Sequence, residues 1–258
     1  MSQQACKYNL SGIQMIQVAN LADSLVAIKQ LVYDEKKCTQ KEMLDALKNN
    51  FEGYEILRAM CVNKVPKYGN DIDEVDKQGT KWADYFKNRL RTFKNISKRS
   101  IIIQEMYTVS AHVPMGENVG RQTPDGRYAK ETELADGGMS PVYGRDIKGP
   151  TAVLKSVSKL DKTLTTNGGL LNMKFLPEFF KTETGIDKFA NFLRTFVDLE
   201  IPHIQFNVVR KEDLLAAKKN PEQYRGLTVR VAGYTAYFTE LADELQNEII
   251  ARTSYGDI

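Results

Sequence analysis

Apolar residues in the first hundred positions recur at steps of three and four, the spacing that gathers side chains on one face of an α-helix. The first predicted face consists of Leu21, Leu25, Ile28 and Val32. A second helix is predicted to begin at Thr39, because "TQKE" has the form of a capping box in which Thr39 and Glu42 bond each other's backbone. Its predicted buried side consists of Met43, Leu44 and Leu47.

Two further helices are predicted before residue 100. The segment "EGYEILRAMCVN" has to end before Pro66, because proline disrupts a helix interior. Its apolar face consists of Ile56, Leu57, Met60 and Cys61. Apolar residues from Val75 to Phe93 follow the pattern of one long helix with a basic opposite face, which we interpret as solvated surface and not as a nucleic-acid site. The acids of "GNDIDEVD" lack the spacing of a calcium loop and suit the start of this helix.

In the second half, strands and helices are predicted to alternate. The run "SIIIQEMYTVSAHV" indicates a strand, and a Gly-, Pro- and Asp-rich loop from Pro114 to Pro150 is expected to wrap the surface or line a cavity. A helix is predicted from Pro150, with Val153, Val157 and Leu160 facing inward. The strands "LLNMKF", "HIQFNVV" and "LTVRVA" then alternate with helices, a pattern typical of parallel strands joined by crossover helices.

Composition excludes several classes of protein. The chain has 258 residues, 42% of them hydrophobic, and a formal charge of +3, which is too balanced to indicate nucleic acid or an anionic membrane as partner. Neither a signal peptide nor an apolar run long enough for a membrane span is found, so a cytoplasmic protein is expected. The three cysteines form no CxxC pair, and His112 and His203 are isolated, so no metal site is expected.

One glycine is unusual in its place. Gly233 interrupts the apolar stretch "VRVAGYTAYF", where glycine weakens a strand and usually marks a bulge, a turn or a close approach of the backbone. The residues around it, Arg230, Val231, Ala232 and Tyr234, complete the sequence Arg-Val-X-Gly-Tyr.

This motif resembles the signature of the glycyl radical enzymes, a family that includes pyruvate formate-lyase and the lyases of glycerol, diols and choline. Further similar blocks are "PKYGND", "TPDGR", "LADGGMSP", "GRDIKGPTAVLKSVSKLD", "LLNMKF", "IQFNVV" and "IIART". The resemblance implies an α/β fold, the C-terminal part of a ten-stranded α/β barrel with a helical N-terminal segment. It divides the chain into a mostly helical segment (1–100), barrel strands with loops and crossover helices (101–210), and a glycyl radical domain (211–258).

The resemblance also implies the chemistry of Gly233. A separate activating enzyme, which uses S-adenosylmethionine and an iron–sulfur cluster, would install a radical there, and the chain itself would bind no cofactor. An α-carbon without Cβ can flatten and delocalise the unpaired electron without hindrance from a side chain. Arg230 and Tyr234 would anchor the loop or assist recognition by the activating enzyme, or simply pack. In the family, the glycyl radical then takes a hydrogen atom from a cysteine, and the resulting thiyl attacks the substrate.

This sequence departs from the family at that cysteine, because none of its three cysteines lies in a Gly-Cys-X-Glu motif. Three origins stay open: a split enzyme whose N-terminal portion is a separate chain and supplies the thiol, a spare part that restores a damaged enzyme, or an inactive fragment. The missing barrel portion also predicts exposed strand edges, and therefore association, including with copies of itself.

For the reaction, the resemblance favours a dehydratase-like lyase that cleaves a C–O or C–N bond of a small substrate such as a diol. A part of a formate C-acetyltransferase-like enzyme, or a non-catalytic repair protein, is the alternative. By the same resemblance, Tyr107 and Val109 would line the substrate pocket, unless they fill the barrel interior.

Overall fold

The computed structural model describes residues 11–94, 102–106, 110, 112–131, 138–161, 163 and 168–258. The helices in this part of the chain are α1 (Val18–Ile28), α2 (Gln40–Lys48), α3 (Glu55–Asn63), α4 (Asp73–Leu90), α5 (His112–Val119), α6 (Pro150–Ser158), α7 (Glu183–Asp198), α8 (Lys211–Lys219) and α9 (Asp243–Ala251). The strands are β1 (Ser11–Gln14), β2 (Ile102–Glu105), β3 (Leu171–Phe175), β4 (Ile204–Val208), β5 (Thr228–Arg230), β6 (Thr235–Tyr237) and β7 (Ser254–Tyr255).

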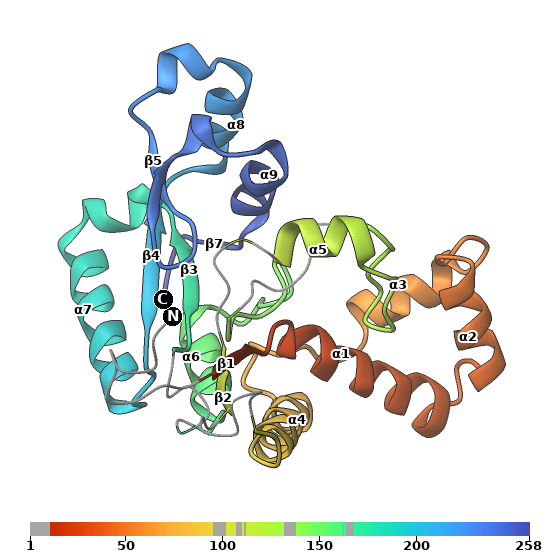
Figure 1. Cartoon of the computed structure of the whole chain (residues 1–258). Helices are drawn as coiled ribbons and strands as arrows, with labels where there is room; N and C mark the ends of the chain where they lie inside the picture. Colours follow the sequence, from red (N-terminus) through yellow and green to blue (C-terminus); the bar gives the residue numbers. More distant parts are fainter. Residues whose placement is uncertain are drawn as a thin grey trace.

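Parallel strands form the centre of the molecule. β3 pairs with β4 on one side and with β7 on the other, and β1 pairs with β2, all in parallel. Met106 continues β2 and forms a parallel bridge with Gly169, just before β3. Figure 1 shows α7 beside β4, the helices α1 to α3 extending away from the sheet to the right of the view, and α8 and α9 at the top.

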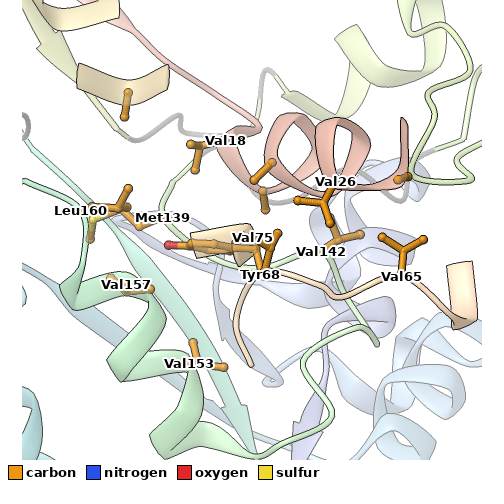
Figure 2. Close-up of a cluster of buried hydrophobic side chains, with 14 of the residues drawn as sticks. Val18, Val26, Val65, Tyr68, Val75, Met139, Val142, Val153, Val157 and Leu160 are labelled. Atoms are coloured by element: carbon orange, nitrogen blue, oxygen red, sulfur yellow. The ribbon is translucent and has the colours of Figure 1, made fainter. Parts of the chain in front are cut away.

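Two apolar clusters are buried in the described residues. The larger one joins the helical segment to the sheet, and Figure 2 shows Val26 of α1, Val75 of α4 and Val157 of α6 meeting around Tyr68. The second cluster is formed almost entirely by residues 209–250, with Leu214, Val231 and Phe238 among its members. The C-terminal end of the chain thus has an apolar core of its own.

Several predicted helix boundaries are confirmed. Thr39 Oγ1 accepts a hydrogen bond from the Glu42 N–H at 3.1 Å, and Glu42 Oε2 accepts from the Thr39 N–H at 2.7 Å, so the capping box begins α2 as expected. α3 ends at Asn63, before Pro66. The acids at the start of α4 form ion pairs: Asp73 and Asp76 both bind Lys159 Nζ, at 2.9 and 2.8 Å.

The predicted buried faces of the first helices are partly wrong. Leu21, Leu44 and Ile56 are exposed, whereas α1 buries Ala22 and Val26 instead. The side chains of α1 pack closely against α4, so small residues take the inner positions and Leu21 is turned outward. A period of 3.6 residues locates a face only roughly, and the packing partner decides which residues occupy it.

Two expectations for the later elements are also wrong. α5 begins at His112, inside the stretch predicted as a strand and loop. Pro114 is tolerated there because backbone N–H groups in the first turn of a helix have no partner within the helix, so the N–H that proline lacks is not needed. β5 is not a third parallel strand but pairs antiparallel with β6. On the predicted basic face, Arg89, Arg91 and Lys94 are exposed as expected, whereas Lys87 is 9% exposed and pairs with Asp161.

No helix in the described part of the chain is both long and apolar enough to cross a bilayer.

Candidate functional site

Gly233 lies in the tight turn between β5 and β6. Arg230 pairs with Thr235, and the Val231 N–H donates to the Tyr234 carbonyl oxygen at 2.9 Å, which leaves Ala232 and Gly233 as the two loop residues. The backbone of Gly233 has φ +80°, a region that L side chains rarely adopt. A Cβ built at this position would meet no heavy atom within 4 Å, so conformation and not crowding favours glycine here.

Two side chains of β4 hold the backbone of the turn. Asn207 accepts from the Arg230 N–H and donates to the Arg230 carbonyl oxygen, each at 2.8 Å. Gln205 Oε1 accepts from the Gly233 N–H at 3.0 Å, and its Nε2 donates to the Val231 carbonyl oxygen at 3.4 Å. The peptide of the candidate glycine is therefore bonded to the central sheet through one glutamine.

A third side chain reaches the same backbone from the end of α9. The guanidinium of Arg252 donates to the carbonyl oxygens of Arg230 and Val231, at 3.1 and 2.7 Å. It also forms two bonds of 3.0 Å with the Glu248 carboxylate, which accepts in addition from the Tyr143 hydroxyl. Both members of the pair are almost fully buried, so this ion pair is shielded from water and salt.

A hollow of about 490 Å³ opens beside Gly233. It is lined by Gly168, Gly169, Leu170, His203, Ala232, Gly233 and Tyr234. Gly233 itself is exposed, so its α-carbon is accessible from this side. Partial burial, together with the charge of Arg230, lowers the pKa of His203, so this imidazole favours its neutral form.

The predicted site residues fall into three groups. Gly233, Ala232 and Tyr234 line the hollow, whereas Val231 is fully buried in the second apolar cluster. Arg230 donates from Nη1 to Thr235 Oγ1 at 3.1 Å across the hairpin. Tyr107 and Val109 lie outside the described residues, so their predicted place in a substrate pocket stays a prediction.

Sequence reasoning missed the three side chains that bond the turn: Gln205, Asn207 and Arg252. A signal was present, because Gln205 and Asn207 alternate with apolar residues in "IQFNVV", and such alternation places both on one face of a strand. Arg252 lies in the family-like block "IIART", but no local pattern indicates its role, because its two carbonyl partners lie 21 and 22 residues earlier in the chain.

The cysteines that the structure describes are not part of this site. Cys38 and Cys61 are buried in the helical segment, and neither lines the hollow. Burial raises the pKa of Cys61 to about 11, which keeps the thiol protonated at neutral pH. Within the described ranges, no group of three or more His, Cys, Asp or Glu side chains is arranged to hold a metal ion.

Two family models together match most of the chain. Residues 1–116 match the model described as pyruvate formate lyase-like, and residues 135–239, which include the turn at Gly233, match the glycine radical model. The chain belongs to the glycyl radical enzyme family. The resemblance on which this was predicted is thereby confirmed.

Individual relatives agree with this assignment. The chain is 40% identical over 247 residues to trans-4-hydroxy-L-proline dehydratase of Clostridioides difficile, covering 96% of this chain and 31% of that protein. It is 39% identical over 256 residues to an isethionate sulfite-lyase of Oleidesulfovibrio alaskensis, covering 96% of this chain and 29% of the other.

A solved structure extends the comparison to the fold. The glycerol-bound form of the B12-independent glycerol dehydratase from Clostridium butyricum superposes with a TM-score of 0.91 at 43% identity, over 97% of this chain and 31% of that one. The predicted fold class, part of the α/β barrel of the glycyl radical enzymes with a helical N-terminal segment, is confirmed. The chain spans about 30% of the length of these relatives.

Proposed function

We propose that this chain is the radical-storing part of a glycyl radical lyase and that the radical resides on Gly233. The observation that carries the proposal is the turn itself. It presents an exposed glycine of the family's Arg-Val-X-Gly-Tyr signature, whose N–H is bonded to β4 while the nearby Val231 carbonyl oxygen is bonded to Arg252 at the end of α9. A radical site needs an α-carbon that a partner can reach and a backbone that returns to one place.

Radical installation would remove a hydrogen atom from the α-carbon of Gly233. The C–H bond breaks homolytically, so one proton and one electron leave together and the residue stays uncharged. The acceptor would be supplied by a separate activating enzyme that uses S-adenosylmethionine and an iron–sulfur cluster, as the family resemblance implies. The contribution of this chain is to hold the glycine in place and to present it to the activating enzyme.

For the reaction of the assembled enzyme, we propose dehydratase-like cleavage of a C–O or C–N bond in a small substrate such as a diol. The support is that similar proteins are named as dehydratases of hydroxyproline and glycerol. The cysteine that forms the thiyl radical would come from another portion of the enzyme, because no cysteine of this chain lies in a Gly-Cys-X-Glu motif. The competing proposals are a part of a formate C-acetyltransferase-like enzyme and a repair protein for a damaged enzyme. We expect the protein to act in the cytoplasm and to form homo-oligomers.

We also propose the division of the chain into segments 1–100, 101–210 and 211–258, the last being the glycyl radical domain. Its support is the second apolar cluster, whose members from Leu214 to Ile250 lie in the last segment and include Val231 beside the turn. A segment with its own core can hold the turn in shape while contacts with the sheet change.

The test is anaerobic activation with a cognate activating enzyme, followed by electron paramagnetic resonance. The wild type should show a doublet, because one α-hydrogen stays on the radical carbon, and Gly233→Ala should show no signal. On exposure to air, mass spectrometry should find the activated wild-type chain cut at Gly233, with a short C-terminal piece released.

The matched control is Gly53→Ala. Gly53 has φ +77° and, like Gly233, nothing within 4 Å of an added Cβ, but it lies in the helical segment. This variant should keep the doublet. A signal that persists in Gly233→Ala would show that the radical resides elsewhere. An equal loss in Gly53→Ala would show that the loss is not specific to Gly233, and either result would contradict the proposal.

A further inference from the structure

We infer that Gln205 is the positioning residue of this site: it holds the Gly233 peptide against the sheet, and its hydrogen bond has to break before Gly233 can enter an activating enzyme. The inference rests on the proposed radical at Gly233 and goes beyond it by naming the contact that controls access to that residue.

The first argument is how the carboxamide of Gln205 is used. Its oxygen accepts from the Gly233 N–H, and its nitrogen donates to Asn172 Oδ1 and to the Val231 carbonyl oxygen. An amide nitrogen has two hydrogens, so both are engaged. A flipped amide would set its nitrogen against an N–H donor and its oxygen against two acceptors, so one orientation alone satisfies all three partners.

The second argument is the burial of this contact. Gln205 is 5% exposed, whereas the glycine that it holds is exposed. The bond is therefore shielded from competing water on the glutamine side, while the α-carbon on the other side faces the hollow. Loss of the bond would leave the Oε1 acceptor of Gln205 buried without a donor. The position in which the turn is bonded to Gln205 is therefore the preferred one.

The third argument is the way in which the hairpin is attached. β5 forms its ladder with β6, in a two-stranded sheet separate from the one that contains β4. The backbone of the turn is bonded to β4 by the side chains of Gln205 and Asn207, and to α9 by Arg252. Side-chain contacts can open without disrupting the central strands, and among these three residues Gln205 alone bonds the peptide of Gly233.

These contacts have a consequence for radical installation. One α-hydrogen of Gly233 occupies the position that a Cβ would have in another residue. A Cβ built there would meet no heavy atom within 4 Å, so this hydrogen points into open space. An active site that encloses Gly233 has to surround it on the side facing β4 as well as on the open side. The turn then has to move away from the sheet, and the 3.0 Å bond between the Gly233 N–H and Gln205 Oε1 cannot persist in that state. The strength of this bond therefore sets the fraction of chains that are ready for activation.

The test begins with the full chain in its radical-free state, where amide hydrogen exchange at Gly233 is measured by nuclear magnetic resonance. In Gln205→Leu, exchange at Gly233 should accelerate by about twofold to tenfold, the range that corresponds to one hydrogen bond. The amide of Phe238, which donates to the Leu227 carbonyl oxygen at 2.8 Å across the same hairpin, serves as reference and should keep its rate.

Further variants keep the test decisive. Gln205→Asn has the same amide on a stem one methylene shorter and replaces the leucine variant if that one does not fold; it should accelerate exchange likewise. Gln246→Leu removes a buried glutamine that bonds the Phe238 and Leu241 carbonyl oxygens of the same segment, and it should leave the exchange rate at Gly233 at the wild-type value.

The second measurement is the initial rate of radical formation under anaerobic activation. Gln205→Leu should activate faster than the wild type by about the same factor as its exchange rate rises, since both require the same opening. Unchanged exchange at Gly233, or an activation rate that does not rise with exchange, would overturn the inference. If no chain forms a radical, the proposed function fails instead, while the exchange measurement still decides whether Gln205 holds Gly233.

Discussion

At the scale of single residues, Gly233 combines a conformational requirement with an open environment. Its positive φ disfavours any side chain, yet the space around it is free. Arg-Val-X-Gly-Tyr is a sequence pattern, and the sequence alone indicated which glycine to consider. It did not indicate that the glycine would be exposed in this chain or bonded through Gln205, because both depend on residues distant along the chain.

The conformation predicts the stability cost of the alanine variants. Gly233→Ala should lower the free energy of unfolding by about 1 kcal/mol, because alanine is strained at positive φ. Gly53→Ala should cost a similar amount, since its φ and its surroundings match. Urea denaturation of the radical-free chains measures both. A much larger loss for Gly233→Ala would mean that this position has packing contacts, and its loss of radical could then not be ascribed to chemistry.

At the scale of elements, β4 connects the site to the core. Its alternating side chains point to two places: Gln205 and Asn207 bond the hairpin, and Phe206 joins an aromatic cluster around Phe175. The centroids of Phe175 and Phe206 lie 5.9 Å apart, within the usual range for aromatic pairs. The strand thus fixes the turn relative to β3 by a pattern that the sequence already contained.

The ion pair at the end of α9 gives the prediction at this scale. Arg252→Leu should destabilise the chain by about 3–5 kcal/mol, because it leaves the buried Glu248 carboxylate without its cation and removes one donor from each of the carbonyl oxygens of Arg230 and Val231. The double variant Arg252→Leu/Glu248→Leu should lose less than the single one, since the stranded charge is gone. Urea denaturation of the two single variants and the double variant checks this, and additive losses would contradict it.

At the scale of the whole molecule, a buried charged cluster joins segments that are far apart in sequence. Arg145 Nη1 lies 2.7 Å from Asp125 Oδ2 and 3.7 Å from Asp23 Oδ2, and Asn20 donates to Asp125 at 3.0 Å. The Tyr68 N–H donates to Asp23 Oδ1 at 2.8 Å. α1 is thereby tied to the loops around residues 68, 125 and 145, which include parts of the blocks "PKYGND", "TPDGR" and "GRDIKGP".

This cluster predicts a pH dependence of stability. Burial raises the pKa of Asp23 from 3.8 to about 7, against the opposing charges of Lys67 and Arg145. The folded state therefore binds more protons than the unfolded state between these values, and the contribution of Asp23 to stability falls as pH rises from about 4 to 7. Its slope is at most about 1.4 kcal/mol per pH unit.

Asp23→Asn should remove that component and keep an oxygen for the Tyr68 N–H. Free energies of unfolding from urea denaturation at pH 5, 6, 7 and 8 measure the difference between variant and wild type. The difference should change with pH up to about 7 and be constant above it. Parallel curves across the whole range would show that Asp23 does not titrate there.

Across all three scales, the sequence determined what depends on neighbours in the chain: the capping box at Thr39, the end of α3 before Pro66, and the family motif around Gly233. Tertiary structure alone decided which face of α1 is buried, that β5 turns back on β6, and that Gln205 and Arg252 hold the turn. Local features follow from bonds within a few residues, whereas packing and side-chain partners depend on which distant segments the fold brings together.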